Sequence, residues 1–202
     1  MERRDNYLIQ ANQAKARFLT FDQQKLIRKF GLKAEEGYLF VTMLARTYRI
    51  CRETADIRYW DGVAWQDGNS YEEVMTLLDL LCDSREDRHP AGQWKNMQSF
   101  GLMFHRNLLE NKRDSVAAVF DREPERFCRG CEALGGVAFP GADMAYEVVF
   151  FDDLKLLIQF WHGDEEFHPR LRYLWDENAL MYLRYETMYF ALSMLRQRLL
   201  EA

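Results

Sequence analysis

The sequence predicts an α+β protein with an antiparallel or mixed sheet, helices packed on it and a long C-terminal helix. The chain alternates between a helical segment, strand-like segments, helices, further strand-like segments and a final helix. No regular strand–helix–strand rhythm appears, which disfavours a parallel α/β sheet. The 202 residues suffice for one domain with a sizeable core, and no linker-like stretch divides them. We therefore expect residues 1–202 to form a single α+β domain.

The first 31 residues predict two helices or one kinked helix. Apolar residues recur at helical spacing over residues 6–30, and Gly31 is placed to cap the C-terminal end. A break is expected near Thr20–Asp22, because either of these residues can cap the N-terminus of a second helix.

An antiparallel meander of three or four strands is predicted next. Short runs rich in β-branched and aromatic residues cover 38–44, 47–51, 56–60 and 63–65, and Asp61-Gly62 is a strong hairpin signal. Tyr48 and Ile50 alternate with arginines, so one face of this sheet should be apolar.

The middle of the chain predicts helices separated by an exposed loop. Ser70 and Glu73 have the spacing of a capping box, which predicts a helix from there to about Ser84. Residues 85–92 are polar and turn-rich and indicate a loop. Residues 94–104 match no single pattern. Residues 107–131 predict one or two helices, interrupted at Pro124.

Three strands and a helix complete the prediction. The apolar runs 146–151, 154–161 and 171–175 predict strands, and Asp176 is expected to cap a helix over 177–199.

Composition excludes several classes of protein. A formal net charge of −5 argues against non-specific binding to nucleic acid or to an anionic membrane. No apolar run is long enough to span a bilayer, and no apolar signal segment follows the N-terminus. We therefore expect a soluble, cytoplasmic protein. Its five Trp and fourteen Phe leave homo-oligomerisation open.

The stretch 162–169, His-Gly-Asp-Glu-Glu-Phe-His-Pro, carries the densest group of chemically active side chains. We expect it to be an architectural turn in a non-catalytic domain that binds a small ligand or a partner protein, with no cofactor. In this reading Gly163 supplies a positive φ, Asp164 caps the turn and Phe167 anchors it in the core. The candidate residues that share this turn are Trp161, Gly163, Asp164, Glu166 and Phe167.

The alternative reading is a divalent-metal enzyme or metal-binding protein. Carboxylates and imidazoles are ligands for divalent ions, and side chains that alternate along an extended backbone can converge on one ion. The residues that would bind it are His162, Asp164, Glu166 and His168. A carboxylate pair acting as acid and base is a further form of this alternative.

A redox role is the third hypothesis. Cys128 and Cys131 have the spacing of a dithiol pair or of half a zinc site, with His105 as the nearest other soft ligand. No second pair follows, and the two cysteines lie toward a predicted helix C-terminus, so partly buried thiols are the expected outcome. Cys51 and Cys82 are expected to be small core residues.

These motifs resemble a family of bacterial and archaeal proteins, the domain-of-unknown-function family 3786. The resemblance rests on residues 158–167, an apolar strand that ends in Trp and leads into Gly-Asp-x-Glu-Phe, followed by Leu174-Trp175-Asp176 and a final helix. It implies that Gly163, Asp164, Glu166 and Phe167 are the family's signature. Some relatives carry an added cysteine-rich segment of iron–sulfur type, and this chain has no such segment.

Overall fold

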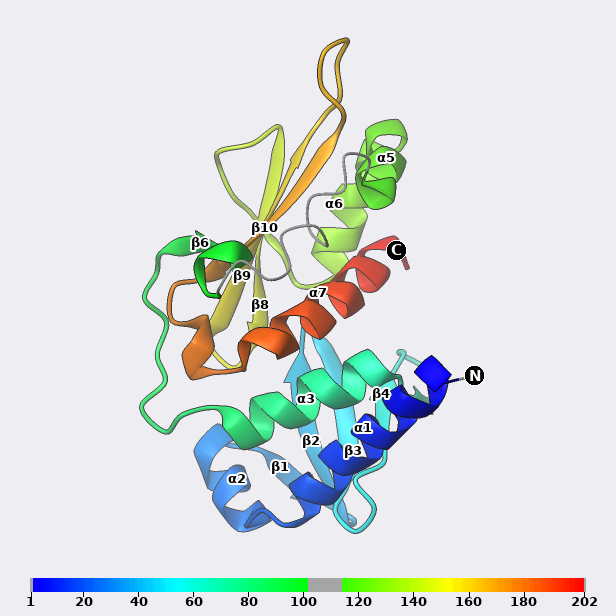
Figure 1. Cartoon of the computed structure of the whole chain (residues 1–202), viewed down its shortest axis with the longest axis vertical. Helices are drawn as coiled ribbons and strands as arrows, with labels where there is room; N and C mark the ends of the chain where they lie inside the picture. Colours follow the sequence, from blue (N-terminus) through cyan, green and yellow to red (C-terminus); the bar gives the residue numbers. More distant parts are fainter. Residues whose placement is uncertain (1, 102–113, 202) are drawn as a thin grey trace. The chain divides into compact units, whose positions relative to one another are not determined.

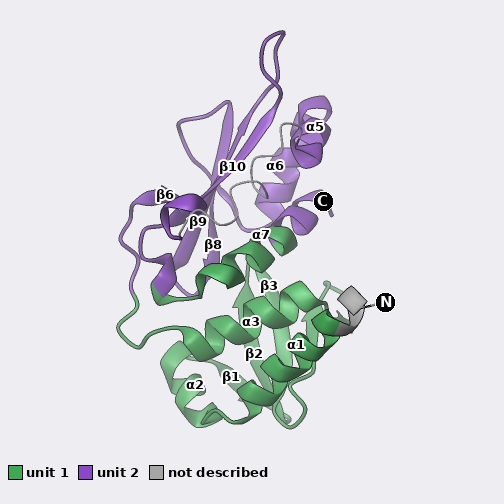
Figure 2. Ribbon diagram, in the orientation of Figure 1, with its two compact units in different colours: residues 1–88, 181–194 green, residues 89–180, 195–202 purple. Residues whose placement is uncertain are grey.

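The computed structural model describes residues 2–101 and 114–201 of the chain (Figure 1). The chain divides into two compact units (Figure 2). Unit 1 comprises Met1–Arg88 and Met181–Met194, and unit 2 comprises His89–Leu180 and Leu195–Ala202. Helices and antiparallel strands occur in both, so the predicted α+β class is confirmed, and the single domain stays a prediction.

Unit 1 begins with two separate helices, α1 (Glu2–Leu19) and α2 (Gln23–Phe30). Asp22 ends the connection and caps α2 by accepting hydrogen bonds from the N–H groups of Gln24 and Lys25. Gly31 closes α2 with a φ of 61°, a left-handed conformation that favours glycine. The break and both caps are where the sequence predicts them.

The meander of unit 1 contains one strand more than the sequence predicts. Its strands pair antiparallel in the order β1-β2-β3-β4-β5. They are β1 (Lys33–Glu35), β2 (Tyr38–Met43), β3 (Arg46–Cys51), β4 (Ile57–Trp60) and β5 (Trp65–Asp67). The short β1 escaped prediction because all three of its residues are exposed and carry no apolar alternation.

One face of this meander is the core of unit 1. Buried side chains alternate with mostly half-buried ones along β2 and β3, and Tyr48 and Ile50 are completely buried as predicted. Helix α3 (Tyr71–Asp83) and α1 lie across the sheet in Figure 1. The predicted capping box opens α3, because Ser70 Oγ accepts the N–H of Glu73 and donates to its carboxylate at 2.9 Å.

Unit 2 contains a second antiparallel group of strands in the order β7-β8-β9-β10-β6. They are β6 (Trp94–Asn96), β7 (Val137–Ala138), β8 (Met144–Phe151), β9 (Leu154–Trp161) and β10 (Arg170–Asp176). A short 3-10 turn, η1 (Met97–Ser99), follows β6. The rings of Phe150 and Trp175 are both fully buried, with their centroids 5.0 Å apart.

Two helices pack with these strands in unit 2, α5 (Ser115–Arg122) and α6 (Pro124–Ala133). Asp114 caps α5 through the N–H groups of Val116 and Ala117, and Pro124 occupies the first turn of α6 as predicted. The rest of the predicted segment 107–131 and His105 lie outside the described residues.

The prediction that Asp176 caps a helix over 177–199 is wrong. Asp176 ends β10 and is 2% exposed, and its carboxylate accepts the N–H groups of Ala91, Gly92 and Asn178. A short 3-10 turn, η2 (Ala179–Met181), comes next, and the long helix α7 runs over Tyr185–Leu200. Tertiary hydrogen bonds to residues about 85 positions away therefore override the local capping signal.

Candidate functional site

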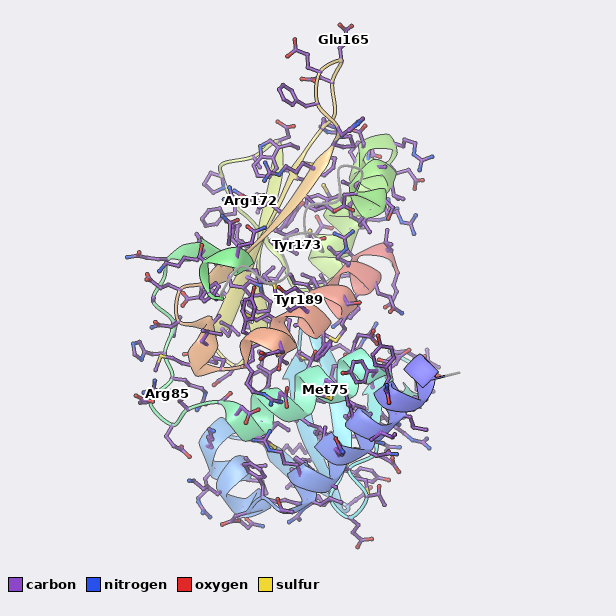
Figure 3. The ribbon with its side chains drawn as sticks, viewed as in Figure 1. Met75, Arg85, Glu165, Arg172, Tyr173 and Tyr189 are labelled. Atoms are coloured by element: carbon purple, nitrogen blue, oxygen red, sulfur yellow. The ribbon has the colours of Figure 1, made fainter. Side chains whose placement is uncertain are left out.

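The stretch 162–169, which we call the acidic turn, joins β9 to β10 in unit 2. The two strands pair in register up to Trp161 and Arg170, so the turn closes a long hairpin. Glu165 lies at its tip and points away from the strands (Figure 3). The buried strands of the hairpin therefore hold an exposed polar turn at their end.

Asp164 organises the acidic turn through the backbone. Its Oδ1 accepts the N–H groups of Glu166 at 2.8 Å and Phe167 at 2.7 Å, and its own N–H donates to the carbonyl of Phe167 at 2.9 Å. This is the capping role that the sequence predicts for an aspartate in a turn.

Gly163 is required for a different reason from the predicted one. It is absent from the glycines with a positive φ. A Cβ at this position would instead lie 2.7 Å from Pro169 Cδ and 3.0 Å from Pro169 N. The predicted positive φ is therefore wrong, and the constraint is the close approach of the two ends of the turn.

Phe167 does not anchor the turn in the core. Its side chain is 69% exposed, which makes the expected core role wrong. Asp164, Glu165, Glu166 and His168 are exposed as well. The acidic turn thus presents one large apolar ring among carboxylates and an imidazole on its surface.

Two aspartates that sequence reasoning missed hold the start of the turn. Asp121, on α5, accepts the N–H of Gly163 at 3.0 Å and faces His162 Nδ1 at 3.1 Å. Asp143, just before β8, accepts the N–H of His162 at 2.8 Å. The N–H of Gly163, together with the ring of His162, holds the pKa of Asp121 below its usual value. Both aspartates are far from the turn in sequence, so no local pattern pointed to them.

Two residues of the metal hypothesis, His162 and Asp164, make different contacts in the structure. His162 faces Asp121 and its ring packs edge-on against Phe160, with the ring centroids 5.0 Å apart. Asp164 uses Oδ1 to cap the turn. Across residues 2–101 and 114–201, no three or more His, Cys, Asp or Glu side chains are grouped so that they would hold a metal ion.

Of the cysteines of the redox hypothesis, Cys131 lies near the C-terminal end of α6, as predicted, and Cys128 lies at the middle of this helix. Cys128 Sγ lies 3.6 Å from Met144 Sδ. Cys131 is completely buried, and burial raises the pKa of its thiol. Because the thiolate is the reactive form, this environment disfavours redox chemistry at Cys131.

The fold and the acidic turn define an α+β protein with a hairpin turn fixed by aspartate–backbone hydrogen bonds. A family model described as Domain of unknown function (DUF3786) matches residues 22–198, and the chain belongs to this family. A search of curated proteins and a search of solved structures gave no match. Within the described residues, no helix has the length and apolar character needed to cross a membrane.

Proposed function

We propose that this chain is a non-catalytic binding domain and that the acidic turn is its contact element for a partner protein. The observation that carries the proposal is the exposed ring of Phe167 on a turn whose backbone is fixed by Asp164. An exposed aromatic ring contributes more binding free energy than any other side chain of the turn, because binding a partner removes its large apolar surface from water.

The fixed backbone favours binding in a second way. A segment that is already ordered loses little conformational entropy when it is captured. The hydrogen bonds from Gly163 to Asp121 and from His162 to Asp143 order the base of the turn before any partner arrives. The carboxylates of Glu165 and Glu166 then favour a partner with a basic surface, through electrostatic complementarity.

The side chains that were candidates for chemistry have structural surroundings that support a binding role. Asp164 serves the backbone of the turn, His162 faces Asp121, and the Cys131 thiol is buried with a raised pKa. A cytoplasmic location belongs to the same proposal. It is supported by four free cysteines, Cys51, Cys82, Cys128 and Cys131, since a reducing compartment keeps thiols unpaired.

The test is affinity purification of the tagged chain after chemical cross-linking in its own cells, with quantitative mass spectrometry. We expect Phe167→Ala to lose the captured partner without loss of folding, because the ring is exposed. Val149→Ala is the matched control, since Val149 is 47% exposed on β8 of the same unit. Equal capture by the wild type and Phe167→Ala would contradict the proposal.

A further inference from the structure

The sheet of unit 1 has a second face, opposite its buried core, that combines aromatic rings with arginines. Antiparallel register places Arg49 beside Phe40 and Arg58, and Trp60 beside Trp65. Residues paired in this way project from the same side of a sheet. We call this side the outer face and define it by Tyr38, Phe40, Arg49, Arg58, Trp60 and Trp65.

Aromatic rings hold Arg49 in place on the outer face. Its Cζ lies 4.6 Å from the ring centroid of Tyr38 and 4.4 Å from that of Trp65. Trp65 in turn packs against Trp60, with the ring centroids 5.4 Å apart. Trp60 itself is 40% exposed, so the arrangement opens to solvent. Cation–π contacts of this kind orient a guanidinium but do not neutralise its charge.

Neither arginine forms an ion pair in the described part of the chain; Lys15 and Thr54 hold the nearby carboxylate of Asp56, on which Arg58 acts only through its charge. Arg49 Nε is buried and has no hydrogen-bond acceptor there, and the guanidinium of Arg58 is exposed and forms no ion pair there. Asp67 lies opposite Arg58, but its carboxylate binds Asn69 instead. Like charges directly opposite each other destabilise a sheet. An arriving carboxylate would relieve this repulsion.

The composition of the outer face favours a protein segment over a nucleic acid. A surface that follows a phosphate backbone needs a row of cations, and the whole chain has a net charge of −5. Trp, Tyr and Arg are the residues that dominate binding energy at protein–protein contacts. The matching segment is therefore acidic and carries an exposed aromatic or apolar side chain.

This chain contains a segment with that chemistry. The acidic turn exposes Phe167 together with the carboxylates of Glu165 and Glu166. We propose that the outer face of one copy binds the acidic turn of a second copy, with Phe167 against Trp60 and Trp65 and the carboxylates on Arg49 and Arg58. This inference rests on the proposed function and identifies the partner as a second copy of this chain. Arginine suits the contact because its planar donors match a carboxylate in pairs.

The proposed contact joins two different surfaces, so it is heterologous. Every copy carries both surfaces, and two copies can exchange them reciprocally or further copies can join in a ring. Self-association should depend on concentration and weaken in salt, because exposed ion pairs are screened.

Two charge-reversal variants test the proposal, with mass measured by analytical ultracentrifugation. The face variant carries Arg49→Glu and Arg58→Glu, and the turn variant carries Glu165→Arg and Glu166→Arg. We expect the wild type to self-associate and each variant alone to have the mass of one chain. An equimolar mixture should recover a 1:1 complex, since an intact turn then meets an intact outer face. Arg85→Glu is the control, because this exposed arginine lies off the outer face and should leave self-association unchanged.

The outcomes separate this inference from the proposed function. A wild-type chain with the mass of one chain at all accessible concentrations would overturn the inference. The proposed function would still stand if Phe167→Ala lost another captured protein. Binding of a fluorescein-labelled single-stranded oligonucleotide to a monomeric wild type, lost in Arg58→Glu, would overturn the inference in favour of nucleic acid. A milder face variant, Arg58→Glu alone, repeats the mixing test if the double variant fails to fold.

Discussion

At the scale of single residues, the acidic turn depends on the absence of a side chain at position 163. Gly163→Ala would place a Cβ 2.7 Å from Pro169 Cδ, so we expect a loss of about 1–3 kcal/mol of unfolding free energy in urea titrations. Adding Pro169→Ala removes the Cδ but leaves the backbone nitrogen, and should recover part of this loss. If the double variant is no more stable than Gly163→Ala, the proline ring is not the obstacle.

Cysteine environments predict an order of thiol reactivity. Hydrogen bonding from the side chain of Thr54 is the main cause that lowers the pKa of Cys51, and burial raises the pKa of Cys82 to about 12. We expect iodoacetamide to modify Cys51 before Cys82 and Cys131 in the folded protein, as followed by peptide mass spectrometry, because the thiolate is the nucleophile. Cys51→Ser should abolish the early product. Early labelling of Cys131 would restore the redox hypothesis.

At the scale of elements, Asp114 joins the start of α5 to α7. It caps α5 and also binds Arg196 through both carboxylate oxygens, at 2.6 and 2.8 Å. Asp114→Ala should lower the unfolding free energy by about 2 kcal/mol, because it removes the cap of α5 and leaves the half-buried guanidinium of Arg196 without its acceptor. Asp114→Asn keeps a capping oxygen and should cost less.

The same carboxylate predicts a dependence on pH. Burial works to raise the pKa of Asp114, but the hydrogen bonds and charge of Arg196 outweigh it and lower the pKa. A lowered folded-state pKa gives stability that is present above the ordinary aspartate value of about 3.9 and is lost as pH falls through the folded value. In urea titrations below pH 4, the unfolding free energy of the wild type should therefore approach that of Asp114→Asn. A difference in unfolding free energy between the two proteins that stays the same at all pH values would contradict the predicted role of the Asp114 carboxylate.

Elements were predictable wherever their signals are local. The capping box at Ser70, the cap at Asp22 and the break at Pro124 each act within one helical turn, and each is present. The start of α7 was not predictable, because the carboxylate of Asp176 accepts the N–H groups of Ala91 and Gly92, which are distant in sequence, and does not cap the final helix. The acidic turn shows the same division. Its Asp164 cap is local and was predicted, whereas Asp121 is 42 residues from Gly163.

At the scale of the whole molecule, the sequence predicted the α+β class from the order of helical and strand-like runs. It did not predict the two compact units, because no linker marks their boundaries and unit 1 is assembled from two separate parts of the chain. Position in a unit also decides exposure. Phe167 is a large apolar residue of the kind usually found in a core. It lies in the turn at the end of the long β9–β10 hairpin, however, and its side chain is exposed to solvent there.

The stability of the whole chain decides between an architectural acidic turn and a metal site. Oδ1 of Asp164 is already bound by two backbone N–H groups, and His162 faces Asp121. We therefore expect a chelator to leave the thermal midpoint of the wild type unchanged, and Asp164→Ala to lose about 1 kcal/mol, as loss of a cap does, with or without chelator. Asp164→Asn is the matched control, because it retains the accepting oxygen. Elemental analysis that finds nearly one equivalent of metal, with a chelator-induced fall of several degrees, would establish the metal hypothesis instead, since a ligand that binds only the folded state raises its stability.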